Sequence, residues 1–258
     1  MKKLIFSTFL IMLGFVPVVV EAGELVRFIS CPIYRDARDG RKSGCWLADD
    51  RESGVRYDVT PSPIKPDWNF EVLVEGYMSD KQDNPCGGVV LEPVHVSKLS
   101  THCTRHMLPA EGFPGRRYSL PPRNVRPLSE ARPTPPGPYT DRTFHMFFEF
   151  NRHFVSYQYG DYLLDTAITW IRAAKPKKLV VTGYAASEPE ELSGRTIAEK
   201  PELARQRAEK MKEALIRLGV PEEQIEIHWA QNPAPVDVEA ADGLAEASRR
   251  RVDIRAQF

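Results

Sequence analysis

The sequence predicts two folded domains, a small all-β domain followed by an α+β domain. Short alternating apolar segments fill residues 24–105, with little helical periodicity. Residues 107–142 are rich in proline and arginine, and such a stretch sustains neither a helix nor a central strand. Residues 143–258 then alternate strand-like and helix-like segments, which is the pattern of an α+β domain.

Composition narrows the classes of function. The chain has 258 residues, 42% of them hydrophobic and 27% charged, and its formal net charge is zero. A neutral chain has no general electrostatic attraction to nucleic acid, so we do not expect that class of partner. The 22 prolines cluster, which favours an extended linker over residues 107–142.

The first 22 residues are typical of a secretory signal. Lys2 and Lys3 precede an apolar run over residues 4–20, and Ala22 offers a small-residue cleavage site. We therefore expect a mature chain that starts at Gly23 and is exported to the periplasm. The alternative is an uncleaved membrane anchor, for which the apolar run is marginal in length.

Export would place the cysteines in an oxidising compartment. All of them fall in the first predicted domain, residues 23–106. Four cysteines in an oxidising compartment predict two disulfides, with three pairings open. The candidates are Cys31, Cys45, Cys86 and Cys103. A metal site would need Cys86 or Cys103 with nearby histidines, but no CxxC pair or helical histidine spacing supports one. We expect no metal and no cofactor.

Alternation of apolar residues predicts about five strands in the first domain. They cover residues 24–29, 44–48, 55–60, 70–76 and 89–99, separated by a charged loop at 35–43 and a polar loop at 79–85. Five strands with little helix indicate a small sandwich or an OB-like barrel.

The second domain, residues 143–258, has the predicted order β-α-β-α-β-β. The strands cover 143–150, 178–184, 224–229 and 249–256, and the helices cover 161–174 and 203–218. Residues 185–200 read as a polar loop and residues 230–248 as an irregular one. This order predicts a mixed sheet with both helices on one face.

The second helix carries an arginine on its apolar face. Leu203, Ala208, Met211 and Leu215 fall within an arc of roughly 140°, and Arg207 lies inside that arc. A guanidinium is not fully desolvated without a partner. Arg207 therefore snorkels, pairs internally, or faces a cleft that binds an anion.

Four motifs in the second domain are similar to motifs of a known protein family. They are FHMFFEF, VVTGYAA, ELARQRAEKMKEALIRLGV and SRRRVDI. Together they resemble the OmpA-like (MotB-like) family of periplasmic peptidoglycan-binding domains over residues 143–258. The resemblance implies a pocket for the diamino acid of a cell-wall stem peptide, with Arg207 holding its carboxylate. It favours this ligand role over internal pairing, and it adds outer-membrane association as an expectation.

The candidate ligand-binding residues that the resemblance implies depart from the family pattern. They are Arg207, Tyr184, Ala186, Ser187 and Arg250. Ala186 stands where the family has the aspartate that holds the ligand's amino group, and Lys200 stands where it has an asparagine. Losing one charge-assisted hydrogen bond weakens binding by roughly 1.5–3 kcal/mol. Glu188, Glu190 or Glu191 in the following loop would supply a replacement carboxylate by looping back.

Three classes of function remain open. The sequence has no Gly-x-Ser-x-Gly, no His-Glu-x-x-His and no phosphate loop. We therefore favour a non-enzymatic envelope protein that binds peptidoglycan weakly or in an altered way, with the first domain serving another envelope protein. The alternatives are an interaction module whose pocket is degenerate, and a periplasmic enzyme within the cysteine-containing domain.

Overall fold

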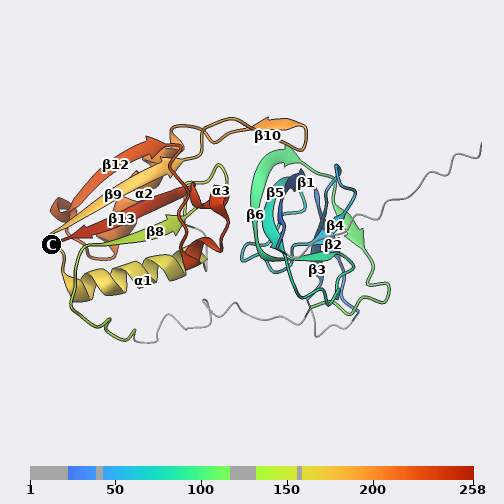
Figure 1. Ribbon diagram of the computed structural model, residues 1–258, viewed down its shortest axis with the longest axis horizontal. Coiled ribbons are helices and arrows are strands. Elements are labelled where there is room, and N and C mark those ends of the chain that lie inside the picture. Colours follow the sequence, from blue (N-terminus) through green and yellow to red (C-terminus); the bar gives the residue numbers. More distant parts are fainter. Residues whose placement is uncertain (1–22, 39–42, 117–131, 156–158) are drawn as a thin grey trace, which may run out of the picture.

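A computed structural model describes residues 23–38, 43–116, 132–155 and 159–258. The predicted signal segment and the centre of the predicted linker lie outside these ranges. The described chain is mostly β with a few helices. Its two larger sheets are formed within residues 25–108 and within residues 142–257, and a small two-stranded sheet lies within residues 190–197 (Figure 1). No helix in the described ranges is long and apolar enough to cross a membrane.

The N-terminal sheet, which comprises the strands between residues 25 and 108, curls back toward itself. Its strands are β1 (Leu25–Ser30), β2 (Pro32–Arg35), β3 (Cys45–Asp49), β4 (Arg56–Asp58), β5 (Phe70–Met78), β6 (Val89–His102) and β7 (His106–Leu108). The order across the sheet is β1-β5-β6-β4-β3-β2-β7. Only Cys31 separates β1 from β2, although they occupy distant places in this order, so the sheet must curve strongly.

Two of these strands were missed in the sequence. We assigned Arg35 to a loop and residues 107 and 108 to the linker, whereas β2 and β7 pair with each other in parallel. The physical reason is that strands of four and three residues show no period of two unless the flanking residues continue it, as Val55 and Val59 do beside β4. Strands β1, β3, β4, β5 and β6 overlap the five predicted segments.

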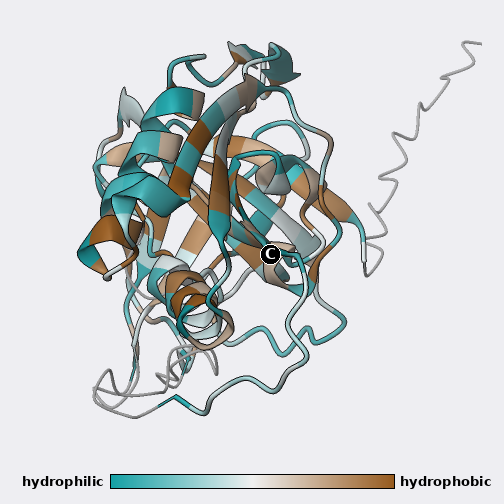
Figure 2. Ribbon diagram, turned by 90° about the vertical axis from the view of Figure 1, so that its left-hand side faces the viewer, coloured by the Kyte–Doolittle hydropathy of each residue, from teal (hydrophilic) through white to brown (hydrophobic). Residues whose placement is uncertain are grey.

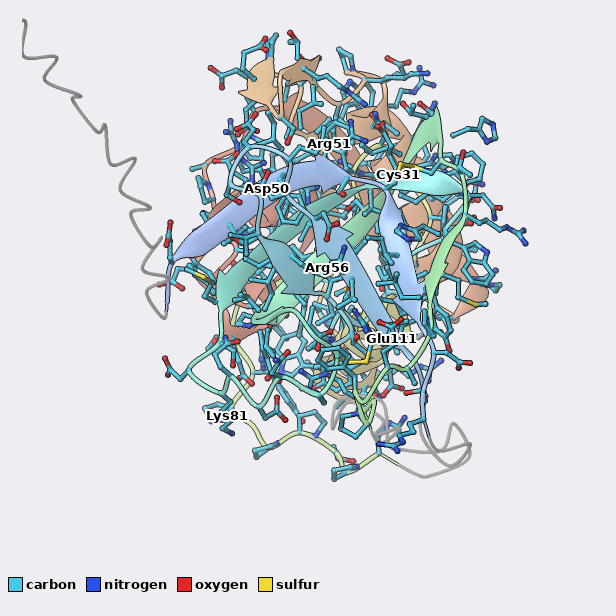
Figure 3. All side chains as sticks on the ribbon, turned by 90° about the vertical axis from the view of Figure 1, so that its right-hand side faces the viewer. Cys31, Asp50, Arg51, Arg56, Lys81 and Glu111 are labelled. Carbon is cyan, nitrogen blue, oxygen red and sulfur yellow. A yellow bond between two sulfur atoms is a disulfide. The ribbon has the colours of Figure 1, made fainter. Side chains whose placement is uncertain are left out.

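The core of the N-terminal sheet is apolar and is closed by two disulfides. Phe28, Val72, Val74 and Leu91 are among its fully buried side chains. The disulfides join Cys31 to Cys103 and Cys45 to Cys86, which selects one of the three possible pairings. Figure 3 views the outer face of this half, with Cys31 and Arg51 in its upper part and Glu111 lower on the same face.

The C-terminal sheet, formed by four strands, is mixed. Its main elements are β8 (Arg142–Phe147), α1 (Tyr159–Ala174), β9 (Lys178–Ala185), α2 (Leu203–Arg217), β12 (Ile225–Gln231) and β13 (Arg251–Gln257). Its strand order is β12-β9-β13-β8, with β12 parallel to β9 and β13 antiparallel to both of its neighbours. Hydrophobic residues run along the strands and helix α1, whereas the outer side of α2 is largely hydrophilic (Figure 2).

Helix α2 packs unusually close to β9, and Gly183 permits it. A Cβ atom at Gly183 would lie 2.0 Å from the carbonyl oxygen of Ala204, which no side chain tolerates. The apolar face of α2 then buries Ala208, Met211 and Leu215 against the sheet. This close packing of α2 on β9 places the side chain of Arg207 in the interior, beside the end of β9.

Both long loops predicted in this half contain regular structure. Residues 190–197 form a hairpin, β10 (Glu190–Leu192) and β11 (Arg195–Ile197), and its turn residues Ser193 and Gly194 both have positive φ. Such a turn suits a two-residue hairpin loop. The second loop contains the short 3-10 helix η3 (Glu239–Ala241) and α3 (Ala245–Ser248). The prediction of loops was wrong here because these elements are too short for periodicity to reveal.

The two disulfides differ in exposure, which predicts an order of reduction. Cys45 and Cys86 are fully buried, whereas Cys31 and Cys103 are partly exposed. Because reduction requires access of the attacking thiolate, a mild reductant should open Cys31–Cys103 first. Alkylation followed by peptide mass spectrometry measures this order, and simultaneous labelling of all four cysteines would contradict it.

Replacing Cys45 and Cys86 by alanine should lower the free energy of unfolding by about 2–4 kcal/mol.

Candidate functional site

Arg207 forms a fully buried ion pair with Glu199. The two side chains have no solvent exposure. Nη1 of Arg207 lies 2.8 Å from Oε2 of Glu199, and Nη2 lies 2.5 Å from Oε1. This is the bidentate geometry that a planar guanidinium makes with a carboxylate. The pair lets a charged residue occupy the apolar face of α2.

The remaining polar atoms of this pair hold backbone groups from separate segments. Nε of Arg207 donates to the carbonyl oxygen of Arg152 at 2.8 Å, and Nη1 donates to that of Tyr184 at 2.7 Å. Glu199 accepts the backbone N–H groups of Asn151 and Ala186, each at 2.9 Å. The pair thus ties α2 and the end of β9 to the turn that follows β8.

Internal pairing is therefore what the structure shows for Arg207. The ligand role that the family resemblance implied stays a prediction, and it would require a ligand carboxylate to displace Glu199. Such an exchange is unfavourable, because a buried carboxylate that loses its partner keeps the cost of its desolvation. Residue 186 also differs from the family pattern, in which a carboxylate at this position holds the ligand's amino group. Ala186 donates its backbone N–H to Glu199 and carries no carboxylate of its own.

The other predicted residues lie around this centre without forming one cluster. The ring of Tyr184 is covered by the guanidinium of Arg251 at 4.8 Å, and burial raises the pKa of its hydroxyl. Ser187 is half-buried, and its backbone N–H donates to Oδ1 of Asn232 at 2.8 Å. Lys200 is exposed, and its backbone N–H donates to the side chain of Asn151.

Arg250 pairs across the boundary between the two halves of the chain. Its guanidinium is buried and forms an ion pair with Glu75 of β5, which is also buried. Glu75 lies 3.2 Å from Arg27 of β1 as well, and Arg27 pairs in turn with Glu190 of the β10–β11 hairpin. Burial alone would raise the pKa of the Glu75 carboxyl, but Arg250 and Arg27 hold it below its usual value.

Further contacts close the same boundary. The backbone N–H of Phe150 donates to Oγ of Ser97 at 3.0 Å, and the backbone N–H of Ile29 donates to Oγ of Ser193 at 2.9 Å. Side chains from both halves share one small apolar cluster. Its buried members are Ile29, Leu73, Leu99, Phe150 and Ile197. The two halves therefore meet in a boundary that is both apolar and charge-paired.

A mixed-charge cavity of about 300 Å³ opens beside Ala186 at this boundary. Arginine and glutamate side chains dominate its lining, which includes Arg27, Arg249, Arg250, Glu188, Glu190 and Glu246. Of the three loop carboxylates considered in the sequence, Glu188 and Glu190 line the cavity. Glu190 is held by Arg27, and Glu191 accepts the hydroxyl of Thr196. Glu188 is the most exposed of the lining carboxylates, and it lies 3.4 Å from Nη2 of Arg249.

Sequence reasoning missed Glu199 and Glu75. Glu199 ends the polar loop before α2, and its separation of eight residues from Arg207 has no regular period that would reveal a pair. Glu75 lies between Val74 and Gly76 on a strand with alternating apolar residues, a pattern that predicts a solvent-facing side chain for it. The arginines at apolar positions were a signal that could have predicted buried carboxylates, because each buried guanidinium requires a carboxylate partner.

Removing the charge of Glu199 should destabilise the fold strongly. Glu199→Gln leaves the Arg207 guanidinium buried without a counter-charge, so we expect a loss of about 3–5 kcal/mol in the free energy of unfolding. Urea denaturation measures it. The matched control is Arg205→Gln on the same helix, whose exposed pair with Glu209 belongs to a class worth about 0.2–1 kcal/mol. Equal losses in the two variants would contradict a structural role for the buried pair.

The stability of the protein should depend on pH through Glu75. A carboxyl whose pKa is lower in the folded state contributes stability above its unfolded pKa, about 4.3. That stability is lost as pH falls through the folded value. We expect the wild type to lose stability below about pH 4.3, and Glu75→Gln to lose less over that range while being less stable at pH 7. Urea midpoints at several pH values test this, with exposed Glu223→Gln as the control. Equal pH slopes in wild type and Glu75→Gln would contradict it.

Comparison of the sequence with models of protein families and with curated proteins finds no match. Among solved structures, the chain is similar to the OmpA-like domain of FopA1 from Francisella tularensis. That likeness has 16% identity, covers 45% of this chain and 71% of the other, and has a TM-score of 0.35.

Two further solved structures match the same share of the chain. One is the peptidoglycan-associated lipoprotein from Burkholderia pseudomallei, with 25% identity over 44% of this chain and 89% of the other, at a TM-score of 0.33. The other is the cell wall anchor of the T6SS from Pseudomonas aeruginosa, with 20% identity over 45% of this chain and 81% of the other, at a TM-score of 0.35. The chain thus resembles the OmpA-like domains over part of its length.

Proposed function

We propose that this chain is an exported, non-enzymatic envelope protein that associates with peptidoglycan through the cavity beside Ala186. The observation that carries the proposal is the charge composition of that cavity, in which three guanidinium groups and three carboxylate groups line a volume of about 300 Å³. A stem peptide presents ammonium and carboxylate groups together, and its recognition needs one anion and one cation.

The pair available to such a ligand is Arg249 with Glu188. Glu188 is 68% exposed and lies 3.4 Å from Arg249, so their contact is weak. Pairs of this kind are worth about 0–1 kcal/mol, and a ligand separates them at little cost. Arg249 itself is 18% exposed and also pairs with Glu246 at 3.1 Å. Arg207 and Glu199, by contrast, are fully enclosed. In this proposal Arg249 takes the ligand's carboxylate, and Glu188 replaces the missing carboxylate of position 186.

The disulfides support an oxidising location, which agrees with export to the periplasm. Both disulfides lie in the N-terminal half, and neither leaves a free thiol among the described cysteines. A cysteine nucleophile is therefore not part of the proposal. The N-terminal sheet is proposed to serve a further envelope protein, and the association with the outer membrane remains a proposal of the same kind.

A second candidate function is an interaction module that does not bind the wall. The closure of Arg207 by Glu199 favours it, because the guanidinium on α2 is no longer accessible. In that case the C-terminal half would keep its fold as a platform, joined to the N-terminal sheet through Glu75 and Arg250. The two candidates differ in whether purified protein binds insoluble peptidoglycan.

Co-sedimentation tests the proposal. Residues 23–258 should sediment with insoluble peptidoglycan at low salt, and Arg249→Gln and Glu188→Gln should each reduce the affinity by about tenfold or more, because each removes a charge-assisted hydrogen bond. Lys210→Gln, on the exposed face of α2, is the matched control and should bind as the wild type does. Absence of sedimentation by the wild type would remove the wall-binding proposal and leave the interaction module.

A further inference from the structure

A second cavity lies at the boundary between the two halves, away from Ala186. Its volume is about 300 Å³. The N-terminal half contributes the loop of residues 64–67 and part of β6, and the C-terminal half contributes the segment after β8. The charged side chains that line it are Lys65, Asp67, Lys98, Glu149 and Arg152, and Phe154 lies at its rim with 52% exposure.

The charged groups on the N-terminal side of this cavity already have partners. Nζ of Lys98 donates to Oδ2 of Asp67 at 2.7 Å. Lys98 also lies over the ring of Phe70, 3.7 Å from its centroid. Nζ of Lys65 donates to the carbonyl oxygens of Thr60 and Ser62. These lysines therefore shape the cavity wall and leave little capacity for a strong additional contact.

Glu149 and Arg152 on the opposite side differ from them. Within the described ranges, neither side chain has an ion-pair partner closer than 4.0 Å, although both line the cavity. Burial raises the pKa of the Glu149 carboxyl, while the charge of Arg152 and the backbone amide of Lys98 offset this only in part. A half-buried carboxylate of this kind is stabilised by a cation placed against it.

The buried Arg207–Glu199 pair holds the backbone that presents these two side chains. The backbone N–H of Arg152 donates to the carbonyl oxygen of Glu149 at 3.1 Å, and Asn151 between them has a φ of 56°. Arg207 binds the carbonyl oxygen of Arg152, and Glu199 binds the N–H of Asn151. The fully buried pair therefore fixes the backbone from which Glu149 and Arg152 project, and a backbone ordered before binding lowers the entropy lost on binding.

We propose that this second cavity binds a small zwitterion, with Arg152 holding its anionic group and Glu149 its ammonium group. Both charges of such a molecule find an opposite charge in the cavity. The exposed ring of Phe154 covers the apolar carbons between the two ligand charges. The site shares no lining residue with the cavity beside Ala186. The two proposals can therefore be tested independently of each other.

Simple probes test the proposal on residues 23–258. Glycine, β-alanine and γ-aminobutyrate carry both charges at increasing separation, whereas acetate and methylammonium each carry one. Titration followed by amide NMR should show shifts at residues 149–154 and at Lys65 and Lys98. We expect one of the three zwitterions to bind with a dissociation constant on the order of 1 mM and both single-charge probes to bind at least about tenfold more weakly.

Two conservative variants separate the roles. Glu149→Gln should weaken the binding of the best zwitterion about tenfold or more while leaving acetate binding unchanged. Arg152→Gln should weaken the binding of the same zwitterion to a similar extent while leaving methylammonium binding unchanged. Glu188→Gln, in the other cavity, is the matched control and should change neither. Urea midpoints close to that of the wild type show that the variants fold. Because both side chains are partly exposed, we expect that result.

Two outcomes would overturn the proposal. One is the absence of shifts at residues 149–154 with all five probes at about 100 mM, which is about a hundred times the expected constant. The other is equal binding of acetate and the zwitterions together with no effect of Glu149→Gln, which would leave only an anion contact. Loss of peptidoglycan binding in Glu188→Gln together with intact zwitterion binding would show that the two sites are separate.

Discussion

The buried pair of Arg207 and Glu199 is the interaction on which the C-terminal half depends. Neither charge could be buried alone, since several kcal/mol of desolvation per ion would remain uncompensated. Together the two side chains bind backbone groups of Tyr184, Ala186, Asn151 and Arg152. The strand β9, the helix α2 and the turn after β8 therefore have a fixed relative position. Gly183 contributes to the same arrangement, because it allows α2 to approach β9.

A second set of buried charges joins the two halves of the chain. Glu75 of the N-terminal sheet lies between Arg27 and Arg250, and Arg27 also binds Glu190 on the β10–β11 hairpin. Arg250, a residue that the family resemblance placed in a ligand pocket, is thus engaged with the other half of the chain. The same boundary contains an apolar cluster and both cavities described above. Ligand sites at this boundary would combine side chains that neither half supplies alone.

The resemblance to OmpA-like domains and the observed site give different accounts of the same helix. The resemblance implies a guanidinium that is open to a ligand carboxylate. In this chain the carboxylate of Glu199 occupies that guanidinium, and position 186 provides a backbone N–H where a carboxylate would be expected. The proposed wall binding therefore relies on Arg249 and Glu188 instead of Arg207. The fold of this half therefore does not by itself specify the charge chemistry at Arg207 and position 186.

The sequence by itself determined the longer elements, the presence of two disulfides and the anomaly at Arg207. Periodicity identified α1, α2 and the longer strands, because burial of one face imposes a regular spacing of apolar residues. Only the tertiary structure decided the cysteine pairing and the strands β2 and β7, since these depend on contacts distant in sequence. It also revealed the β10–β11 hairpin, which is local but has strands too short for periodicity to identify. It also decided the partners Glu199 and Glu75. Burying a guanidinium requires a carboxylate nearby in space, and the sequence does not specify where along the chain that carboxylate lies.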